Sequence, residues 1–196
     1  MFPRCPLIRC TLTFVASFAV AGYNATVFAY GQSGSGKTFT MGTSTSTLHT
    51  PAEGMIPRAL KKIFRIVEED IASGYRILCS FIEIYNEEFM DLLLGVSSKP
   101  KDSKEIQIRE DADGRIMVNG LSELQIESVE AALMLLEKGN SVRRTAGTLL
   151  NEVSSRSHAI FTINIEKYIG TANESENDDD GEILFAKLHL VDLAGK

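Results

Sequence analysis

The spacing of apolar and polar positions predicts strands and helices that alternate along the chain. Residues 26–30 form a short apolar run rich in β-branched and aromatic side chains, which is typical of a buried strand. Pro57 then opens a segment with apolar residues at helical spacing, namely Leu60, Ile63, Phe64, Val67 and Ile71. Residues 75–85 are apolar on both alternations, which predicts a strand covered on both faces.

The second half of the chain continues this alternation. Two short strand-like runs, at 106–108 and 115–118, are flanked by Gly, Pro, Asp and Asn residues. This pattern predicts a small hairpin. We expect Ser128 to cap a helix and Gly139 to end it, with an apolar stripe of Val129, Ala132, Leu133 and Leu136. Two strand-like runs follow, at 159–168 and 183–191. The order predicts a single α/β domain with a mostly parallel central sheet.

Composition and charge exclude several classes of protein. The 196 residues are 44% hydrophobic and 23% charged, as in a soluble globular domain, and no run is apolar enough to span a membrane. The formal charge is −6, but residues 173–182 hold six acids and no base, and the rest of the chain is neutral. We therefore expect no nucleic-acid partner and no membrane association. The three cysteines, Cys5, Cys10 and Cys79, are expected to be free thiols in a reducing compartment.

Residues 1–21 are the most ambiguous segment. Arg4 and Arg9 precede an apolar stretch that ends in Ala19-x-Ala21, which is the pattern of a secretory signal. A short apolar helix or a mis-joined exon would give the same pattern. We treat 1–21 as an N-terminal segment of uncertain assignment and 22–196 as the domain.

A phosphate-binding loop follows the first predicted strand. The pattern G-x-x-x-x-G-K-[ST] is met by Gly31, Gln32, Ser33, Gly34, Ser35, Gly36, Lys37 and Thr38. In such a loop, several successive backbone N–H groups point toward one phosphate group. The N-terminus of the following helix points toward the same phosphate. Lys37 would neutralise phosphate oxygens, and the Thr38 hydroxyl would bind Mg²⁺. The alternative is a Gly/Ser-rich turn with a chance lysine.

Two further segments carry side chains suited to the γ-phosphate. Asp192 ends an apolar strand and would join the Mg²⁺ shell, while Gly195 offers an N–H to the γ-phosphate. Residues 151–158 are rich in hydroxyls that would order a water or the metal. An ordinary Ser-rich loop is the alternative for this second segment.

Taken together, these segments resemble the kinesin motor domain. The matching residues are 22–42, 54–58, 81–87, 91–93, 151–158 and 192–195, in the order and spacing of that family. Myosins differ, since they typically have Phe-Gly-Lys where this chain has Ser157-His158. Gly139-Asn140, residues 155–161 and the acidic insertion look closest to the chromokinesin-like branch.

The resemblance implies an ATPase that moves along microtubules, with ATP and Mg²⁺ as cofactors. Asn151 would contact the nucleotide, Ser154 would hold the water network at the γ-phosphate, and Arg156 would pair with a switch glutamate. Ser155 would approach Mg²⁺, which Asp192 would bind through water, and Gly195 would sense the γ-phosphate.

Other residues gain their roles only from the resemblance. Phe39 would pack on the adenine. Arg109 and Arg115 lie in a hairpin that resembles a tubulin-facing loop, although a solvated surface is the alternative.

The resemblance also sets expectations about the whole protein. It implies a P-loop NTPase-type three-layer domain, incomplete at both chain ends, because Ser-Glu does not follow Gly195 and no Arg-x-Arg-Pro precedes the loop. It implies microtubules as partner, oligomers through a missing stalk, and a cytoplasmic, cytoskeletal location. A non-motor product that only binds a partner through a partial nucleotide pocket is the alternative. A GTPase is disfavoured because no Asn-Lys-x-Asp base reader is present.

Overall fold

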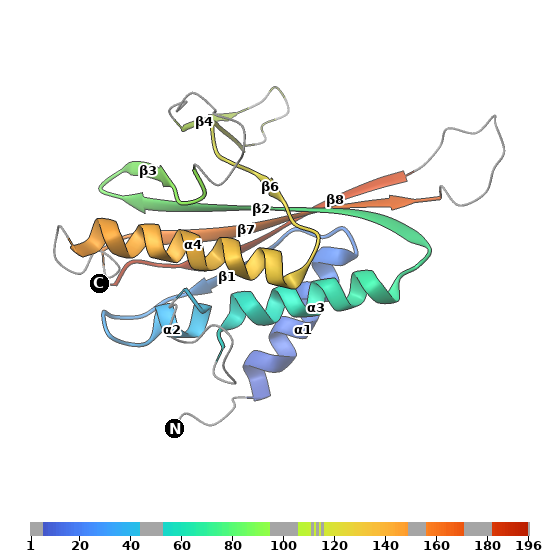
Figure 1. Cartoon of the computed structure of the whole chain (residues 1–196), viewed down its shortest axis with the longest axis horizontal. Coiled ribbons are helices and arrows are strands. Elements are labelled where there is room, and N and C mark those ends of the chain that lie inside the picture. The colour runs from blue at the N-terminus through green and yellow to red at the C-terminus, as the bar shows by residue number, and fades with distance from the viewer. Residues whose placement is uncertain are drawn as a thin grey trace.

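A six-stranded sheet with helices on one face organises the chain (Figure 1). The computed structural model describes residues 6–43, 53–94, 106–110, 112, 114, 116–148, 156–170 and 182–195. Its helices are α1 (Pro6–Val20), α2 (Lys37–Met41), α3 (Met55–Glu69) and α4 (Val129–Thr148). Its strands are β1 (Ala25–Ala29), β2 (Ser73–Tyr85), β3 (Glu88–Asp91), β4 (Gln107–Glu110), β5 (Ile116–Asn119), β6 (Leu124–Gln125), β7 (His158–Ile169) and β8 (Glu182–Asp192).

The sheet is mixed, so the prediction of a mostly parallel sheet is wrong although the α/β class is confirmed. The strand order is β1-β8-β7-β2-β3, with β6 beside β2. Only β1 and β8 run parallel, and the other described pairs in this sheet are antiparallel. β7 and β8, which are consecutive among the described strands, pair antiparallel. They pair along their whole lengths, from Ala159 opposite Asp192 to Ile169 opposite Glu182.

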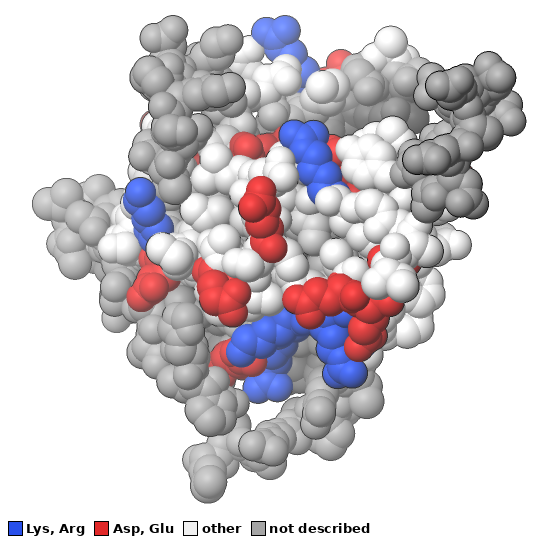
Figure 2. Space-filling model, turned by 45° about the vertical axis from the view of Figure 1, so that its right-hand side comes forward, with Lys and Arg blue, Asp and Glu red and all other residues white. Residues whose placement is uncertain are grey.

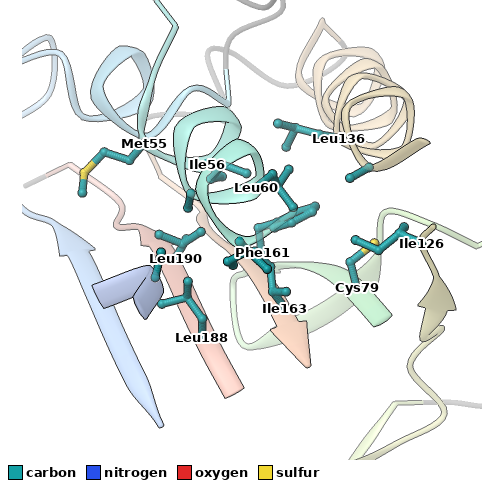
Figure 3. Close-up of a cluster of buried hydrophobic side chains, with 14 of the residues drawn as sticks. Met55, Ile56, Leu60, Cys79, Ile126, Leu136, Phe161, Ile163, Leu188 and Leu190 are labelled. Carbon is teal, nitrogen blue, oxygen red and sulfur yellow. The ribbon is translucent and has the colours of Figure 1, made fainter. Parts of the chain in front are cut away.

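The hydrophobic core lies between the sheet and α1, α3 and α4. Figure 3 shows part of it, where Met55, Ile56 and Leu60 of α3 and Leu136 of α4 meet Phe161, Ile163, Leu188 and Leu190 of the sheet. Burying each such side chain contributes about 1.5 to 3 kcal/mol. Residues 6–20, part of the ambiguous N-terminal segment, form a helix, and Leu12, Ala16 and Ala19 belong to this core.

The opposite face of the sheet carries exposed apolar side chains. Phe28 of β1 is 61% exposed and Phe185 of β8 is 64% exposed, and Ile183, two positions before Phe185, is also exposed. The described helices all contribute to the other face through one core, so the described residues form two layers. The described residues do not include the third layer that the resemblance implies, and that layer stays a prediction.

The predicted elements are present among the described residues, with three differences. The first strand is predicted to be buried, but β1 is covered on one face only, since Phe28 is exposed. The other two differences are at helix ends. The predicted cap is confirmed, since Ser128 Oγ accepts a hydrogen bond from Ala131 N at 3.1 Å. Gly139, however, lies inside α4, which continues to Thr148. Ile71 follows the end of α3 and is 96% exposed, so it does not belong to the apolar stripe.

The surface shows acids and bases side by side. On the face in Figure 2, blue and red side chains adjoin one another. The described ion pairs include Lys61–Glu53 and Arg65–Glu69. Arg109 in the exposed β4–β5 hairpin donates to its neighbour Gln107 at 2.7 Å. Arg115 lies outside the described residues.

No described helix has both the length and the apolar character to cross a membrane.

Candidate functional site

Three segments meet at one edge of the sheet. Because β1 and β8 are parallel, the loop that follows β1 and the residues that follow β8 leave the sheet at the same edge. Leu193 N extends this pairing by donating to Ala29 O at 3.3 Å. Since β7 is antiparallel to β8, it begins at this edge, with Ala159 opposite Asp192. The phosphate loop, residues 193–195 and the described part of the third predicted segment, 156–158, are thereby brought to the same edge.

The phosphate loop has the predicted strand, loop and helix context. It lies between β1 and the short helix α2, and its Gly34 and Gly36 have φ angles of 78° and 91°, a left-handed backbone that glycine adopts without strain. Lys37 is largely buried, and its Nζ donates to the carbonyl oxygens of Gly31 at 2.8 Å and Gln32 at 2.9 Å. The loop thus folds around its own lysine.

Asp192 joins the phosphate loop to the end of β8. Its Oδ2 atom accepts hydrogen bonds from Thr38 Oγ1 at 2.9 Å and Thr43 Oγ1 at 3.1 Å. The carboxylate is 1% exposed, yet its Oδ1 atom has no hydrogen-bond partner among the described residues. A buried carboxylate oxygen without a donor is costly, and it marks a place where an ion or water would be stabilised.

The residues after Asp192 lie against the loop and against the start of β7. A Cβ atom added to Gly195 would lie 2.2 Å from Ser33 Oγ and 2.9 Å from Ser33 N, so a side chain at Gly195 would require the loop to move. Ala194 N donates to His158 Nδ1 at 3.1 Å. These contacts connect residues 193–195 to both neighbouring segments.

A buried ion-pair cluster, which the sequence did not predict, supports this edge. Arg143 of α4 pairs with Glu83 of β2 at 3.0 Å and with Asp192 at 3.1 Å. Its Nη2 also donates to Ser157 Oγ at 3.1 Å, and that hydroxyl donates to Glu83 Oε1 at 2.6 Å. The one available signal was Glu83, an acid in a strand that is apolar on both faces.

The remaining predicted site residues are only partly described. Asn151, Ser154 and Ser155 lie outside the described residues. Arg156 is an exposed turn residue immediately before Ser157. Phe39 lies on α2, next to Thr38, and is 46% exposed.

The described residues fit Mg²⁺. This ion prefers oxygen ligands and is commonly held by a hydroxyl and one or two carboxylates together with phosphate oxygens. Thr38 and Asp192 supply a hydroxyl and a carboxylate in contact with each other, and Asp192 Oδ1 is unpaired among the described residues.

The kinesin motor domain family model matches residues 8–196, nearly the whole chain. The chain belongs to the kinesin motor domain family. It is 43% identical over 176 residues to kinesin-like protein KIF7 of Mus musculus, a match that covers 89% of this chain and 13% of that protein. A match to chromosome-associated kinesin KIF4 of Gallus gallus has 44% identity and covers 89% of this chain and 14% of the relative.

A solved kinesin structure has the same fold. It is described as the structure of a fast kinesin, with implications for ATPase mechanism and interactions with microtubules. The TM-score is 0.80 at 33% identity, and the match covers 96% of this chain and 49% of that one. The chain therefore spans about half of that kinesin and a small part of its curated relatives.

The comparisons do not separate the branches of kinesins. KIN-5A of Arabidopsis thaliana is 43% identical over 180 residues, a match that covers 89% of this chain and 17% of the relative. KIF7, KIF4 and KIN-5A are thus about equally similar to this chain. The chromokinesin-like assignment stays a prediction.

Proposed function

We propose that this chain binds ATP with Mg²⁺ at the phosphate loop and that the protein hydrolyses ATP to move along microtubules. The observation that carries the proposal is the hydrogen bond between Thr38 and Asp192, 2.9 Å long and made across 154 positions of sequence. It joins the hydroxyl of the phosphate loop to the carboxylate at the end of β8, the two groups that hold the metal in phosphate-loop NTPases.

The described residues would each perform one part of nucleotide binding. The N–H groups of residues 31–36 would bind phosphate oxygens, and Lys37 would neutralise their charge. Thr38 and Asp192 would hold Mg²⁺, with Asp192 acting through water. Bound Mg²⁺ would screen the phosphate charges.

The hydrolysis step would use the segments before β7 and after β8. Asn151 would contact the nucleotide, Ser154 would position the attacking water, and Ser155 would approach Mg²⁺. Gly195 would offer its N–H to the γ-phosphate, and its close approach to Ser33 supports a position beside the loop. Arg156 would stabilise the closed arrangement, and Phe39 would pack on the adenine.

The partner and location of the protein follow from the family. Microtubules are the proposed partner, and the cytoplasm and its cytoskeleton the proposed location. The solved kinesin, whose description names interactions with microtubules, supports this at 33% identity. Oligomers would form through a stalk outside this chain.

A lysine substitution in the full-length protein tests the proposal. We expect Lys37→Ala to weaken ATP binding at least about 30-fold, because a buried charged donor would be lost, and to abolish microtubule-stimulated phosphate release. Lys138→Ala, at an exposed lysine of α4, is the matched control and should leave both unchanged. ATP affinity that is equal in the two variants would contradict the proposal.

A further inference from the structure

Arg143 connects α4 to β2, to β8 and to the residue before β7 in the interior of the domain. It lies on α4 and is 5% exposed. Its Nε donates to Glu83 of β2 at 3.0 Å, and its Nη1 donates to Asp192 of β8 at 3.1 Å. Its Nη2 donates to Ser157, before β7, at 3.1 Å to Oγ and 3.4 Å to the carbonyl oxygen. Arg143, Glu83, Ser157 and Asp192 together are called the Arg143 cluster below.

The Arg143 cluster holds more negative than positive charge. Glu83 and Asp192 are 2% and 1% exposed, and the guanidinium of Arg143 is the cluster's one basic group. Burying a carboxylate without a matching cation is costly. A cation at Asp192 would restore the balance, and Asp192 Oδ1 is the atom without a partner among the described residues.

Every described donor to Asp192 approaches the same oxygen. Thr38, Thr43 and Arg143 all donate to Oδ2, at 2.9, 3.1 and 3.1 Å. Such one-sided bonding holds the carboxylate in one orientation and directs Oδ1 away from the donors. Of the three donors, Arg143 alone carries a charge, and its planar fork is itself held by Glu83.

We infer that Arg143 is a positioning residue for the metal shell of the nucleotide site. It holds Asp192 by Oδ2 so that Oδ1 stays available to Mg²⁺ and its waters, and Glu83 holds Arg143. Groups that orient a metal-binding carboxylate in this way affect metal affinity without contacting the metal. This inference rests on the proposed function, because it requires Asp192 to serve a Mg-nucleotide.

The guanidinium of Arg143 also connects Asp192, the proposed metal-binding carboxylate, to the residues before β7. Ser157 directly follows Arg156, one of the predicted catalytic residues, and is fully buried. It bonds both Arg143 and Glu83. Arg143 therefore fixes Asp192 relative to Ser157, which belongs to the predicted site segment 151–158.

The test measures how much Mg²⁺ strengthens ATP binding by the full-length protein. ATP affinity is determined with excess Mg²⁺ and with a chelator, and the ratio of the two is the Mg²⁺ enhancement. We expect Arg143→Lys, which keeps the charge but loses the fork, to lower this enhancement at least about tenfold. The ATP affinity of this variant measured with the chelator should stay at the wild-type value. Arg65→Lys, at an exposed arginine of α3, should match the wild type in both.

A second variant covers the case in which Arg143→Lys fails to fold. Glu83→Gln keeps the size of the side chain and weakens the hold on Arg143, and we expect it to lower the enhancement by a smaller factor. Thermal unfolding shows which variants are folded. The inference is overturned if a folded Arg143→Lys keeps the wild-type enhancement, or loses affinity equally with and without Mg²⁺. If only Glu83→Gln folds, an unchanged enhancement in that variant overturns it.

The wild type separates this inference from the proposed function. If wild-type ATP binding gains nothing from Mg²⁺, the proposed function fails and this inference fails with it. If Mg²⁺ strengthens wild-type binding and Asp192→Asn removes the gain while Arg143→Lys keeps it, the proposed function stands. The positioning role alone is then wrong.

Discussion

Gly139 of α4 lies directly against the ring of Phe81 of β2. A Cβ atom added to Gly139 would be 2.3 Å from Phe81 Cδ1 and 2.8 Å from Cε1. Phe81 is fully buried and meets Phe161 edge to face at 5.5 Å between ring centroids. The ring is enclosed by the core, and the absence of a side chain at Gly139 lets the helix approach the sheet closely.

We predict that Gly139→Ala destabilises the fold by about 1 to 3 kcal/mol, despite the better helix propensity of alanine, because the added methyl overpacks the core. Urea unfolding followed by circular dichroism measures this change. Gly74→Ala is the matched control, since its Cβ would meet Tyr168 at an ordinary 3.5 Å. An unchanged or raised midpoint for Gly139→Ala would show that the helix can move away from Phe81 at little cost.

Gly195 gives a corresponding prediction for the site. We expect Gly195→Ala to weaken ATP binding about tenfold or more, because its methyl would collide with Ser33 and shift the phosphate loop. The thermal midpoint should change little, since Gly195 follows the end of β8, is only partly buried and does not belong to the hydrophobic core cluster. Fluorescence titration with an ATP analogue measures the affinity. Wild-type affinity in this variant would mean that residues 193–195 and the loop do not need their close contact.

The Cys79 thiol should be unreactive in the folded protein. It is fully buried in β2, and burial raises the pKa of this thiol to about 12. Because the thiolate is the nucleophile, alkylation near pH 8 should be slow until the protein unfolds. Mass spectrometry of the Cys79 peptide after timed iodoacetamide labelling, with and without denaturant, measures this directly. Rapid labelling of Cys79 without denaturant would contradict the buried position. Cys5 and the side chain of Cys10 lie outside what the structure describes, so no rate is predicted for them.

His189 should make stability fall at acidic pH. Burial, and next the charge of Lys187, lower the pKa of His189, whose Nδ1 lies 2.9 Å from Thr162 Oγ1. The unfolded chain therefore binds a proton at His189 at a higher pH than the folded chain does. Stability is full above the unfolded pKa of about 6.5 and falls as the pH drops below it, until the lowered folded pKa is reached.

The matched variant is His189→Gln, which cannot titrate. We predict that its urea midpoint falls less than that of the wild type between about pH 7.5 and about pH 5, because the proton uptake at this site is removed. Other titrating groups affect both proteins alike, so the difference between the two curves isolates His189. Parallel curves would show that the histidine has the same pKa in both states.

The sequence predicted those features that have a local pattern. The phosphate loop, the strand before it and the cap at Ser128 each depend on a few neighbouring residues, and the structure has all three. Asp192 could be found because it ends an apolar strand and Gly195 follows three positions later.

Features set by contacts between distant elements could not be found in this way. Gly139 has the appearance of a helix end, and the contact with Phe81 that explains it comes from another element. The direction of β7 relative to β8 is set by the pairing of the two strands along their lengths, which neither strand's own pattern gives. Arg143 has no local pattern at all, because its ion-pair partners come from β2 and β8.

The most direct test of the nucleotide site is the ATP affinity of the wild type and of Asp192→Asn, each with Mg²⁺ and with a chelator. The wild type should bind ATP more tightly with Mg²⁺, and Asp192→Asn should lose most of that gain while it keeps the chelator affinity, because its loop is intact. Wild-type ATP binding that is absent, or that is the same with Mg²⁺ as with the chelator, would contradict the assignment of this edge of the sheet as a Mg-ATP site.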